Sequence, residues 1–355
     1  MSSAKPAPVL EALTSALNVP IQKREDSFYE PRQQGYYSPS PEGTWQLAQT
    51  NQTHAPNHSL PALNRRNIRL ISWNIDVLTP FHEERMSAAL TYLDELVFST
   101  PPDVAIVVFL QEMGTSDMQQ IRESVWIKKR FYLTDVDETS WLSPYYGTTM
   151  LVDRRLQINS VFRVPWYSKF DRDGLFVDIC ISESAKANAN PRFIRLCNTH
   201  LESLVADPPV RPIQIAVASQ YLHQSSVSCG VVAGDLNAIQ PFDRTLHTEN
   251  KLNDAYLMCG GSEDSEDGYT WGQQVPEALR NRFGCSRMDK ILYMGSIQPT
   301  SFERIGIDVK VAEEHRQKMR EAGQLEWVTD HYGVMADFVL LEGGELGQIG
   351  QSAML

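Results

Sequence analysis

The feature that most constrains the fold of this chain is a repeated sequence pattern. Six apolar segments are directly followed or preceded by polar residues that can support catalysis. Those polar residues are Asn74, Asp76, Glu112, His200, Asp235, Asn237, Asp289, Asp330 and His331. A single Asp or Asn after a strand is usually a turn residue that bonds its own backbone. Repetition at six places predicts instead that strand ends meet at one edge and form an oxygen-rich pocket with two imidazoles.

The apolar segments follow one another in runs, with helical patterns between them at irregular intervals. In residues 83–98, Met86, Leu90, Leu93 and Val97 recur at spacings of four, three and four, which predicts one buried helix face. Further helices are expected at 118–129 and 209–223. Strands are expected at 68–73, 104–110, 148–152, 157–163, 175–181, 193–199, 231–233, 288–293 and 333–340. This pattern favours an α/β fold of two sheets packed face to face, with helices outside.

Composition divides the chain into three parts. Residues 1–66 hold eight of the 20 prolines, with Ser, Gln and Asn clusters and few apolar runs. Such a segment buries too little surface to offset its ordering entropy, so we expect a mostly disordered tail in which 9–17 could form a short helix. One catalytic domain is expected over residues 67–342, and residues 343–355 are expected to form a second tail.

The charge balance limits the kind of ligand. The 32 Lys and Arg residues against 44 Asp and Glu residues give a net charge of −12, which disfavours a protein that coats duplex nucleic acid with a basic surface. Residues 122–172 differ, with nine basic against six acidic residues. This segment is the best candidate for a rim that binds one nucleic-acid strand.

Several classes of protein are disfavoured by missing signals. No apolar run approaches the length of a membrane span, and the first residues lack the basic start and apolar stretch of a secretory signal. The five cysteines contain no CxxC pair, and Cys180, Cys197 and Cys229 lie in or beside strand-like runs, so we expect these three to be small core residues in a reducing compartment. HExxH, a P-loop and GxGxxG are absent, which disfavours a zinc protease and a protein that binds nucleoside triphosphates or dinucleotides.

An oxygen-rich pocket suits a hard divalent cation, Mg²⁺ or Mn²⁺. Such a cation, a positioned water and donors around a phosphate together support hydrolysis of a phosphodiester. In that chemistry Glu112 could hold the metal, and Asp235 could orient or deprotonate the water.

Other polar residues at the segment ends suit contacts to a phosphate. Asn74 and Asn237 could donate to phosphate oxygens without repelling them. His331 could stabilise the transition state if a carboxylate orients its ring, and both Asp289 and Asp330 are candidates for that role.

Six motifs carry a resemblance to a known superfamily. SWNID, FLQE, NTHLES, AGDLN, RMDKI and TDHYG, in this order, resemble the exonuclease/endonuclease/phosphatase superfamily. The resemblance extends from Ile68 to Leu340 and implies a four-layer α-β-β-α sandwich of two mixed sheets with a divalent metal. Within the superfamily the sequence is most similar to the 5′-tyrosyl-DNA phosphodiesterases, on WNID, HLES, the segment Tyr145-Tyr146-Gly147-Thr148, and Tyr269-Thr270-Trp271 ahead of RMDKI.

The resemblance implies roles on the metal side of the site. Asn74 and Glu112 match metal and phosphate ligands, Asp76 matches a carboxylate that supports the metal waters, and Asp330 lies near the metal. The implied cofactor is Mg²⁺, with Mn²⁺ as the alternative.

The resemblance also implies the catalytic and substrate contacts. Asp235 matches the water-activating aspartate, Asn237 and His200 match phosphate contacts, and His331 matches a transition-state histidine that Asp289 orients. Trp271 and Tyr145 are the candidate substrate-binding aromatics, since a ring can stack on a base. The implied substrate is a DNA end with a 5′ adduct. The enzyme is expected to be a monomer that acts in the nucleus or cytoplasm.

Two departures from the family pattern leave alternatives open. Val77 follows WNID where the family has Gly, and Ala238-Ile239-Gln240 follow GDLN where the family has a basic residue that contacts DNA. Alternative functions on the same metal site are a general or abasic-site nuclease, a deadenylase, and a phospholipid or inositol-phosphate phosphatase. A further alternative is a catalytically inactive binding protein on this fold.

Overall fold

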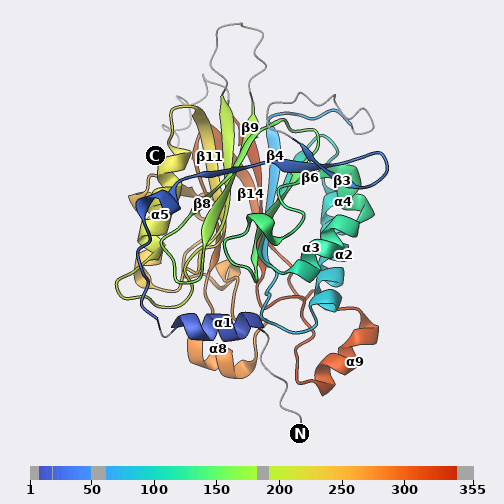
Figure 1. Cartoon of the computed structure of the whole chain (residues 1–355), viewed down its shortest axis with the longest axis vertical. Coiled ribbons are helices and arrows are strands. Elements are labelled where there is room, and N and C mark those ends of the chain that lie inside the picture. Colours follow the sequence, from blue (N-terminus) through green and yellow to red (C-terminus); the bar gives the residue numbers. More distant parts are fainter. Residues whose placement is uncertain (1–7, 18, 49–60, 182–191, 342–355) are drawn as a thin grey trace, which may run out of the picture.

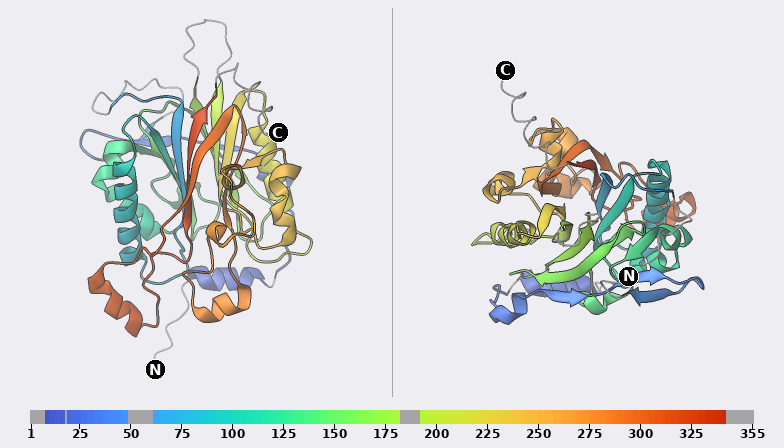
Figure 2. Two further views of the ribbon diagram at one scale, coloured as in Figure 1. Left: turned by 180° about the vertical axis from the view of Figure 1, so that it is seen from behind. Right: turned by 90° about the horizontal axis from the view of Figure 1, so that it is seen from above.

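A computed structural model describes residues 8–17, 19–48, 61–181 and 192–341 (Figure 1). Two mixed β-sheets pack against each other, and helices cover the outer faces of both (Figures 1 and 2). The predicted α/β fold with four layers, α-β-β-α, is therefore confirmed. Within the described residues, no helix has both the length and the apolarity needed to cross a membrane.

The first sheet has seven strands, among which β10 and β11 are parallel neighbours and the other pairs are antiparallel. In spatial order the strands are β1 (Arg32–Gln34), β8 (Ile158–Pro165), β9 (Asp173–Cys180), β10 (Phe193–His200), β11 (Val227–Asp235), β13 (Asp289–Gly295) and β12 (Asn253–Asp254). The parallel pair therefore lies near the middle of this sheet.

The second sheet has eight strands and also contains one parallel pair, β4 with β5. In spatial order the strands are β14 (Ile297–Ile305), β15 (Gly333–Leu340), β4 (Asn67–Asn74), β5 (Ala105–Met113), β7 (Gly147–Asp153), β6 (Phe131–Leu133), β2 (Tyr36–Pro39) and β3 (Trp45–Ala48). The carboxyl ends of both parallel pairs lie at the lower end of the molecule in Figure 1.

The helices form the outer layers and part of the lower end. Those on the eight-stranded sheet are α2 (His82–Ser99), α3 (Thr115–Glu123) and α4 (Val125–Arg130). Those on the seven-stranded sheet are α5 (Arg211–Leu222) and α6 (Leu246–Glu249), with α7 (Ala255–Met258) after the short β12. At the lower end lie α1 (Pro8–Leu17), α8 (Glu277–Phe283) and α9 (Glu313–Glu321) (Figure 1). The 3-10 turns are η1 (Asp26–Tyr29), η2 (Glu138–Ser140), η3 (Pro241–Arg244) and η4 (Glu266–Gly268).

Apolar side chains from the two inner sheet faces form the central core, which includes Phe109, Val177, Leu196 and Phe338. The outer face of the second sheet is covered by α2, which buries Met86, Leu90, Leu93 and Val97 as the spacing predicts. The predicted helix at 118–129 is two helices, because Ser124 adopts an extended conformation (ψ 122°) between α3 and α4.

The structure differs from the disordered tail expected over residues 1–66. Strand β1 pairs with β8, with Arg32 opposite Arg163, and β2 pairs with β6, so the segment closes an edge of each sheet. Tyr36 is 2 % exposed, and Gln34 accepts a hydrogen bond from Nε of the buried Arg163 at 3.1 Å. The helix α1 agrees with the short helix expected at 9–17. The second expected tail, 343–355, lies outside the described residues.

All five cysteines lie in the described residues and are free thiols. Cys197 and Cys229 are fully buried in central strands, as small core residues would be, whereas Cys180 at the end of β9 is only partly buried.

Candidate active site

Strand register places three of the predicted site residues next to one another. His200 of β10 lies opposite Asp235 of β11 in the parallel pair, and Asp235 lies opposite Asp289 of the antiparallel β13. Gly234 has φ +145°, and a Cβ there would lie 1.8 Å from the carbonyl oxygen of Thr199. The AGD motif therefore needs glycine so that β10 and β11 can bring their terminal residues together.

The second sheet supplies the opposite wall. Asn74 of β4 lies opposite Gln111 of β5, so Asn74 and the next residue on β5, Glu112, reach the same end. The ladder between β5 and β7 shifts register between Leu110 and Met113, and Glu112 lies in that irregularity.

Strained backbone gathers around this end. Eight non-glycine residues in the described part have positive φ, and five surround the site: Asp76, Glu112, Asp171, Leu204 and Asn237. Non-glycine residues in this region cost about 1–3 kcal/mol each and persist where surrounding structure requires them. Their concentration here indicates a site whose geometry is selected at the expense of stability.

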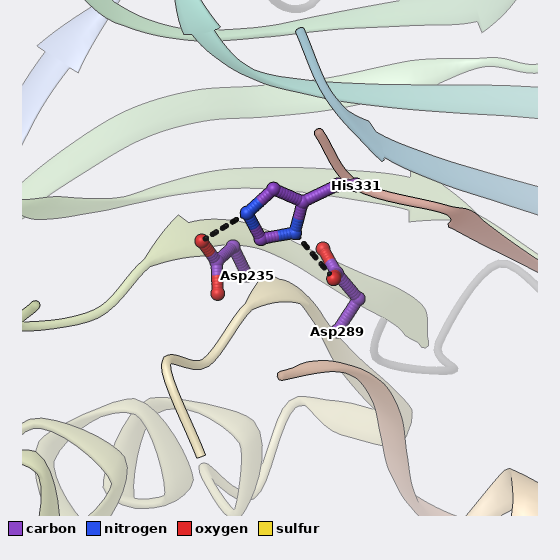
Figure 3. Close-up of side chains that lie close together, drawn as sticks. All are labelled: Asp235, Asp289 and His331. Atoms are coloured by element: carbon purple, nitrogen blue, oxygen red, sulfur yellow. Dashed lines mark hydrogen bonds and ion pairs between the residues drawn. The ribbon is translucent and has the colours of Figure 1, made fainter. Parts of the chain in front are cut away.

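Two carboxylates flank the imidazole of His331 (Figure 3). Nδ1 lies 2.8 Å from Oδ2 of Asp289, and Nε2 lies 3.7 Å from Oδ2 of Asp235. Burial lowers the pKa of His331, but Asp289, Asp235 and Asp330 outweigh it and hold the pKa well above its ordinary value. The surrounding carboxylates therefore favour the protonated form of the ring, and Asp289 orients it.

Asp235 is the centre of the hydrogen-bond network. Its Oδ2 accepts from Nδ2 of Asn74 at 3.0 Å and lies 3.3 Å from Nε2 of His200, while its Oδ1 accepts from the backbone N–H of Asn237 at 2.8 Å. Burial alone raises the pKa of Asp235, but His331 and His200 overcome that effect, and the pKa falls below its usual range. Asp235 therefore keeps its negative charge.

The predicted amide and imidazole groups are largely occupied by protein partners. Oδ1 of Asn74 accepts from the backbone N–H of Asp76 at 2.9 Å, and Nδ2 of Asn237 donates to the carbonyl of Leu201 at 3.1 Å. Nδ1 of His200 lies 2.6 Å from Nη1 of Arg172. His200 therefore links Arg172 to Asp235, a role that the sequence does not predict. The phosphate contact expected of His200 stays a prediction.

Asp76, Glu112 and Asp330 form an acidic cluster on the other side of the site. Burial, then Asp330 and Glu112, raise the pKa of Asp76 to about 8, although Thr79 donates to the Asp76 carboxylate. Oδ2 of Asp330 accepts from the indole N–H of Trp271 at 2.7 Å. A cation among these three carboxylates would offset their mutual repulsion and favour their ionised forms.

Arg85, which sequence reasoning missed, braces this acidic cluster. Its side chain is buried and donates to the carbonyls of Pro80 and Leu325 at 2.8 and 2.9 Å. These carbonyls lie on the loops that carry Asp76 and Asp330. Arg85 therefore ties the two loops together, close enough to Asp76 and Asp330 for their charges to act on it.

The donor set fits a hard divalent cation. Carboxylate and amide oxygens from Glu112, Asp76, Asp330 and Asn74 are the ligand types that Mg²⁺ and Mn²⁺ prefer. After burial, the charges of Asp330 and Glu112 contribute to the raised pKa of Asp76, and a cation would offset these charges. Among the described residues, Asp235, Asp289 and His331 are the one group of three acidic, imidazole or thiol side chains whose ligand atoms all lie within 4.8 Å of one another, so this second group could hold an ion by donor spacing. In that group the imidazolium already supplies the positive charge.

A small pocket opens beside Glu112 and His200, and its walls include Arg172 and Tyr146. Nη2 of Arg172 donates to Oγ of Ser203 at 2.9 Å, its guanidinium lies 5.0 Å from the Tyr146 ring centroid, and its buried Nε has no hydrogen-bond partner. No carboxylate in the described residues forms an ion pair with Arg172. A buried guanidinium of this kind is available to an anion.

The structure gives different outcomes for three predicted substrate contacts: Tyr145, Trp271 and the basic segment 122–172. Tyr145 is 41 % exposed and does not line this pocket, because its neighbour Tyr146 takes the inward position. Trp271 lies at the site through its bond to Asp330. In the basic rim expected over 122–172, Arg130 and Arg155 pair with Asp153 and Arg163 pairs with Asp135 and Asp173, so these three arginines are not free to bind a strand.

The chain is thus a four-layer sandwich with carboxylates and imidazoles gathered at the ends of its two parallel strand pairs. The model of the Endonuclease/Exonuclease/phosphatase family matches residues 71–331, and the chain belongs to this family. A comparison with curated proteins found no match.

Solved structures with the same fold include those of TDP2. Truncated Caenorhabditis elegans TDP2 is 19% identical, with a TM-score of 0.57 over 77% of this chain and 97% of that chain. D. rerio TDP2 complexed with single strand DNA product is 18% identical, with a TM-score of 0.54 over 77% and 98% of the two chains. The human Nocturnin catalytic domain with bound sulfate anion is 17% identical, with a TM-score of 0.51 over 79% and 96%. These similarities show the fold.

Proposed function

We propose that this protein is a Mg²⁺-dependent phosphodiesterase that hydrolyses 5′-phosphotyrosyl linkages at DNA ends. The observation that carries the proposal is one buried site in which the His331 imidazolium and the Arg172 guanidinium face an acidic cluster. Cationic donors on one side and oxygen ligands on the other are what phosphodiester hydrolysis requires.

The cation would be held by Glu112, Asp76, Asp330 and Asn74. When bound, Mg²⁺ neutralises charge that develops on the phosphate oxygens and favours ionisation of a water. The same four residues would also accept Mn²⁺.

The protein residues would divide the remaining work. Asp235, with its lowered pKa, accepts a hydrogen bond from the attacking water and fixes its direction toward phosphorus. His331 donates from Nε2 to a phosphate oxygen while Asp289 holds Nδ1, and Arg172 donates to another oxygen. A P–O bond to water forms, the P–O bond to the tyrosyl oxygen breaks, and the tyrosine leaves with a proton, without a covalent enzyme intermediate.

Two observations support DNA as the substrate class. The motif resemblance is strongest to 5′-tyrosyl-DNA phosphodiesterases, and the chain shares its fold with D. rerio TDP2 complexed with single strand DNA product. The similarity to the Nocturnin catalytic domain keeps other phosphoesters as competitors in any test. By the same resemblance we propose a monomer that acts in the nucleus or cytoplasm.

A substrate panel tests the proposal. Purified protein with Mg²⁺ is offered a 5′-tyrosyl oligonucleotide, an abasic duplex, a polyadenylated RNA and sphingomyelin vesicles, with Glu112→Gln as the metal-site control and Glu314→Gln as a matched exposed control. We expect tyrosine release from the first substrate by the wild type and by Glu314→Gln. Preference for another substrate would contradict the proposed specificity, and full activity of Glu112→Gln would contradict the metal site.

A further inference from the structure

The loop after β10 exposes two apolar side chains beside the site. Leu204 is 49 % exposed and Val205 is 68 % exposed. They directly follow Ser203, whose Oγ accepts from Arg172 at 2.9 Å and lies 3.4 Å from Nδ2 of Asn237. The apolar pair is therefore continuous with the anion-binding wall of the site.

Buried polar contacts hold the loop that carries Leu204 and Val205 in this conformation. The guanidinium of Arg211, which is 2 % exposed, donates to the carbonyls of Glu202 at 3.1 Å and Leu204 at 2.8 Å. It also pairs with Asp243 at 2.8 Å. Leu204 has φ +65°, a strained value for a γ-branched residue without glycine's freedom. The exposure of Leu204 and Val205 is thus built into the fold.

The segments next to this apolar pair offer no basic side chain to a second phosphate. Residues 201–210 contain no Lys or Arg, and neither do residues 238–240. The two segments are adjacent, because Arg211 donates both to the carbonyl of Leu204 and to Oε1 of Gln240 at 3.1 Å. A nucleic-acid backbone is held mainly by basic side chains, so an apolar group suits this position better than a phosphate does.

We propose that Leu204 and Val205 form a contact surface for the apolar face of the terminal nucleobase, next to the scissile phosphate. This inference rests on the proposed function and names the part of the substrate that the loop contacts. The net charge of −12 opposes attraction of this pair to an anionic lipid surface. The DNA end is then selected by an exposed, unpaired base.

Binding measurements test the base contact. Fluorescence anisotropy gives Kd values for two 5′-phosphorylated single-stranded oligonucleotides, one with a 5′-terminal thymidine and one with an abasic 5′-terminal residue. The proteins are the wild type, the double variant Leu204→Ser/Val205→Ser, and Phe98→Ser. Phe98 is a matched control, since it is 90 % exposed and lies near the carboxyl end of α2, away from the site.

We expect the wild type and Phe98→Ser to bind the thymidine oligonucleotide about tenfold more tightly than the abasic one, and the double variant to lose that preference. Equal binding of both oligonucleotides by the wild type, or a preference retained in the double variant, would overturn the inference. Loss of binding to phosphatidylcholine vesicles in the double variant, with the base preference intact, would assign the loop to lipid and would also overturn it.

Tyrosine release from a 5′-tyrosyl oligonucleotide, measured on the same samples, separates the two claims. A wild type that prefers the base but releases no tyrosine would contradict the proposed function and leave the base contact standing. Tyrosine release without any base preference would contradict only the base contact.

Discussion

The side-chain amide of Gln111 in β5 donates to Oδ1 of Asn198 in β10 at 2.8 Å and so joins the two sheets immediately behind the site. Nδ2 of Asn198 donates to the carbonyls of Leu110 at 3.0 Å and Thr149 at 2.8 Å, both in the second sheet. Gln111 precedes Glu112, and Asn198 lies two residues before His200. This buried link fixes the separation between the two halves of the site.

Replacing Asn198 with Leu is expected to lower the free energy of unfolding by about 2–4 kcal/mol, because the buried amide and carbonyl groups that Asn198 bonds would lose their hydrogen-bond partner. The activity of the surviving folded protein is expected to fall about 10- to 100-fold, since small displacements of Glu112 and His200 weaken catalysis. Urea denaturation and initial rates check both effects. Asn253→Leu is the exposed control, and equal stability of the two variants would contradict the role of the link.

Mg²⁺ is expected to raise the thermal stability of the wild type. The carboxylates of Asp76, Glu112 and Asp330 repel one another, and a cation that binds only the folded state adds about 2.7 kcal/mol at a concentration 100 times its Kd. Differential scanning fluorimetry with EDTA and with increasing Mg²⁺ measures the shift in Tm. The shift should vanish in Glu112→Gln and persist in Glu314→Gln, and a shift of equal size in both would place the cation elsewhere.

Arg172→Lys is expected to reduce kcat/KM about 10²- to 10³-fold with little loss of stability. Lysine keeps the charge but cannot reach His200 and Ser203 at once while facing the pocket, because it lacks the planar fork of the guanidinium. Steady-state kinetics on a 5′-tyrosyl oligonucleotide measures the effect, with the half-buried Lys169→Arg in the same loop as the control. Wild-type kinetics in Arg172→Lys would remove Arg172 from the proposed mechanism.

Asp117 is expected to make stability fall as pH rises. Burial raises the pKa of Asp117 to about 7 even though its Oδ2 accepts from the backbone N–H of Gly114. The folded state therefore holds a proton that the unfolded state releases near pH 4. The resulting loss in the free energy of unfolding grows between about pH 4 and pH 7 and is then constant.

Asp117→Asn removes this titration and keeps an oxygen acceptor for Gly114. Above pH 7 it should be more stable than the wild type by about 2–4 kcal/mol, with the difference shrinking toward pH 4. Urea midpoints at several pH values check the sign. The exposed Asp267→Asn should track the wild type, and identical pH profiles for Asp117→Asn and the wild type would contradict the raised pKa.

Much of the fold could be predicted because the central strands are continuous apolar runs. Strand β5 and strand β10 are buried along almost their whole length, so their sequences reveal them without neighbours. Strand β14 escaped prediction because its burial is irregular and Pro299 interrupts it, as suits an edge strand. The short polar strands β1–β3 form only through pairing with the edges of the two sheets, which composition cannot indicate.

The candidate site was predictable where a residue ends a strand and unpredictable where it lies in a loop. Asp235 and His200 follow recognisable apolar strands, and their register then brings them together. Arg172 and Arg85 carry no local signal, because an isolated arginine has the same sequence context whether it is solvated or buried. Tyr146 had a signal, since it precedes Thr148 by two residues and shares its inward face, but the alternation is short.

Tyrosine release from a single-stranded 5′-phosphotyrosyl oligonucleotide tests the central claim most directly. The wild type with Mg²⁺ is compared with Glu112→Gln, His331→Gln and a sample in EDTA. We expect multiple turnovers only in the wild type with Mg²⁺, with losses of at least about 10³-fold in both variants. Turnover that survives EDTA, or that is unchanged in either variant, would contradict a metal-dependent phosphodiesterase centred on these residues.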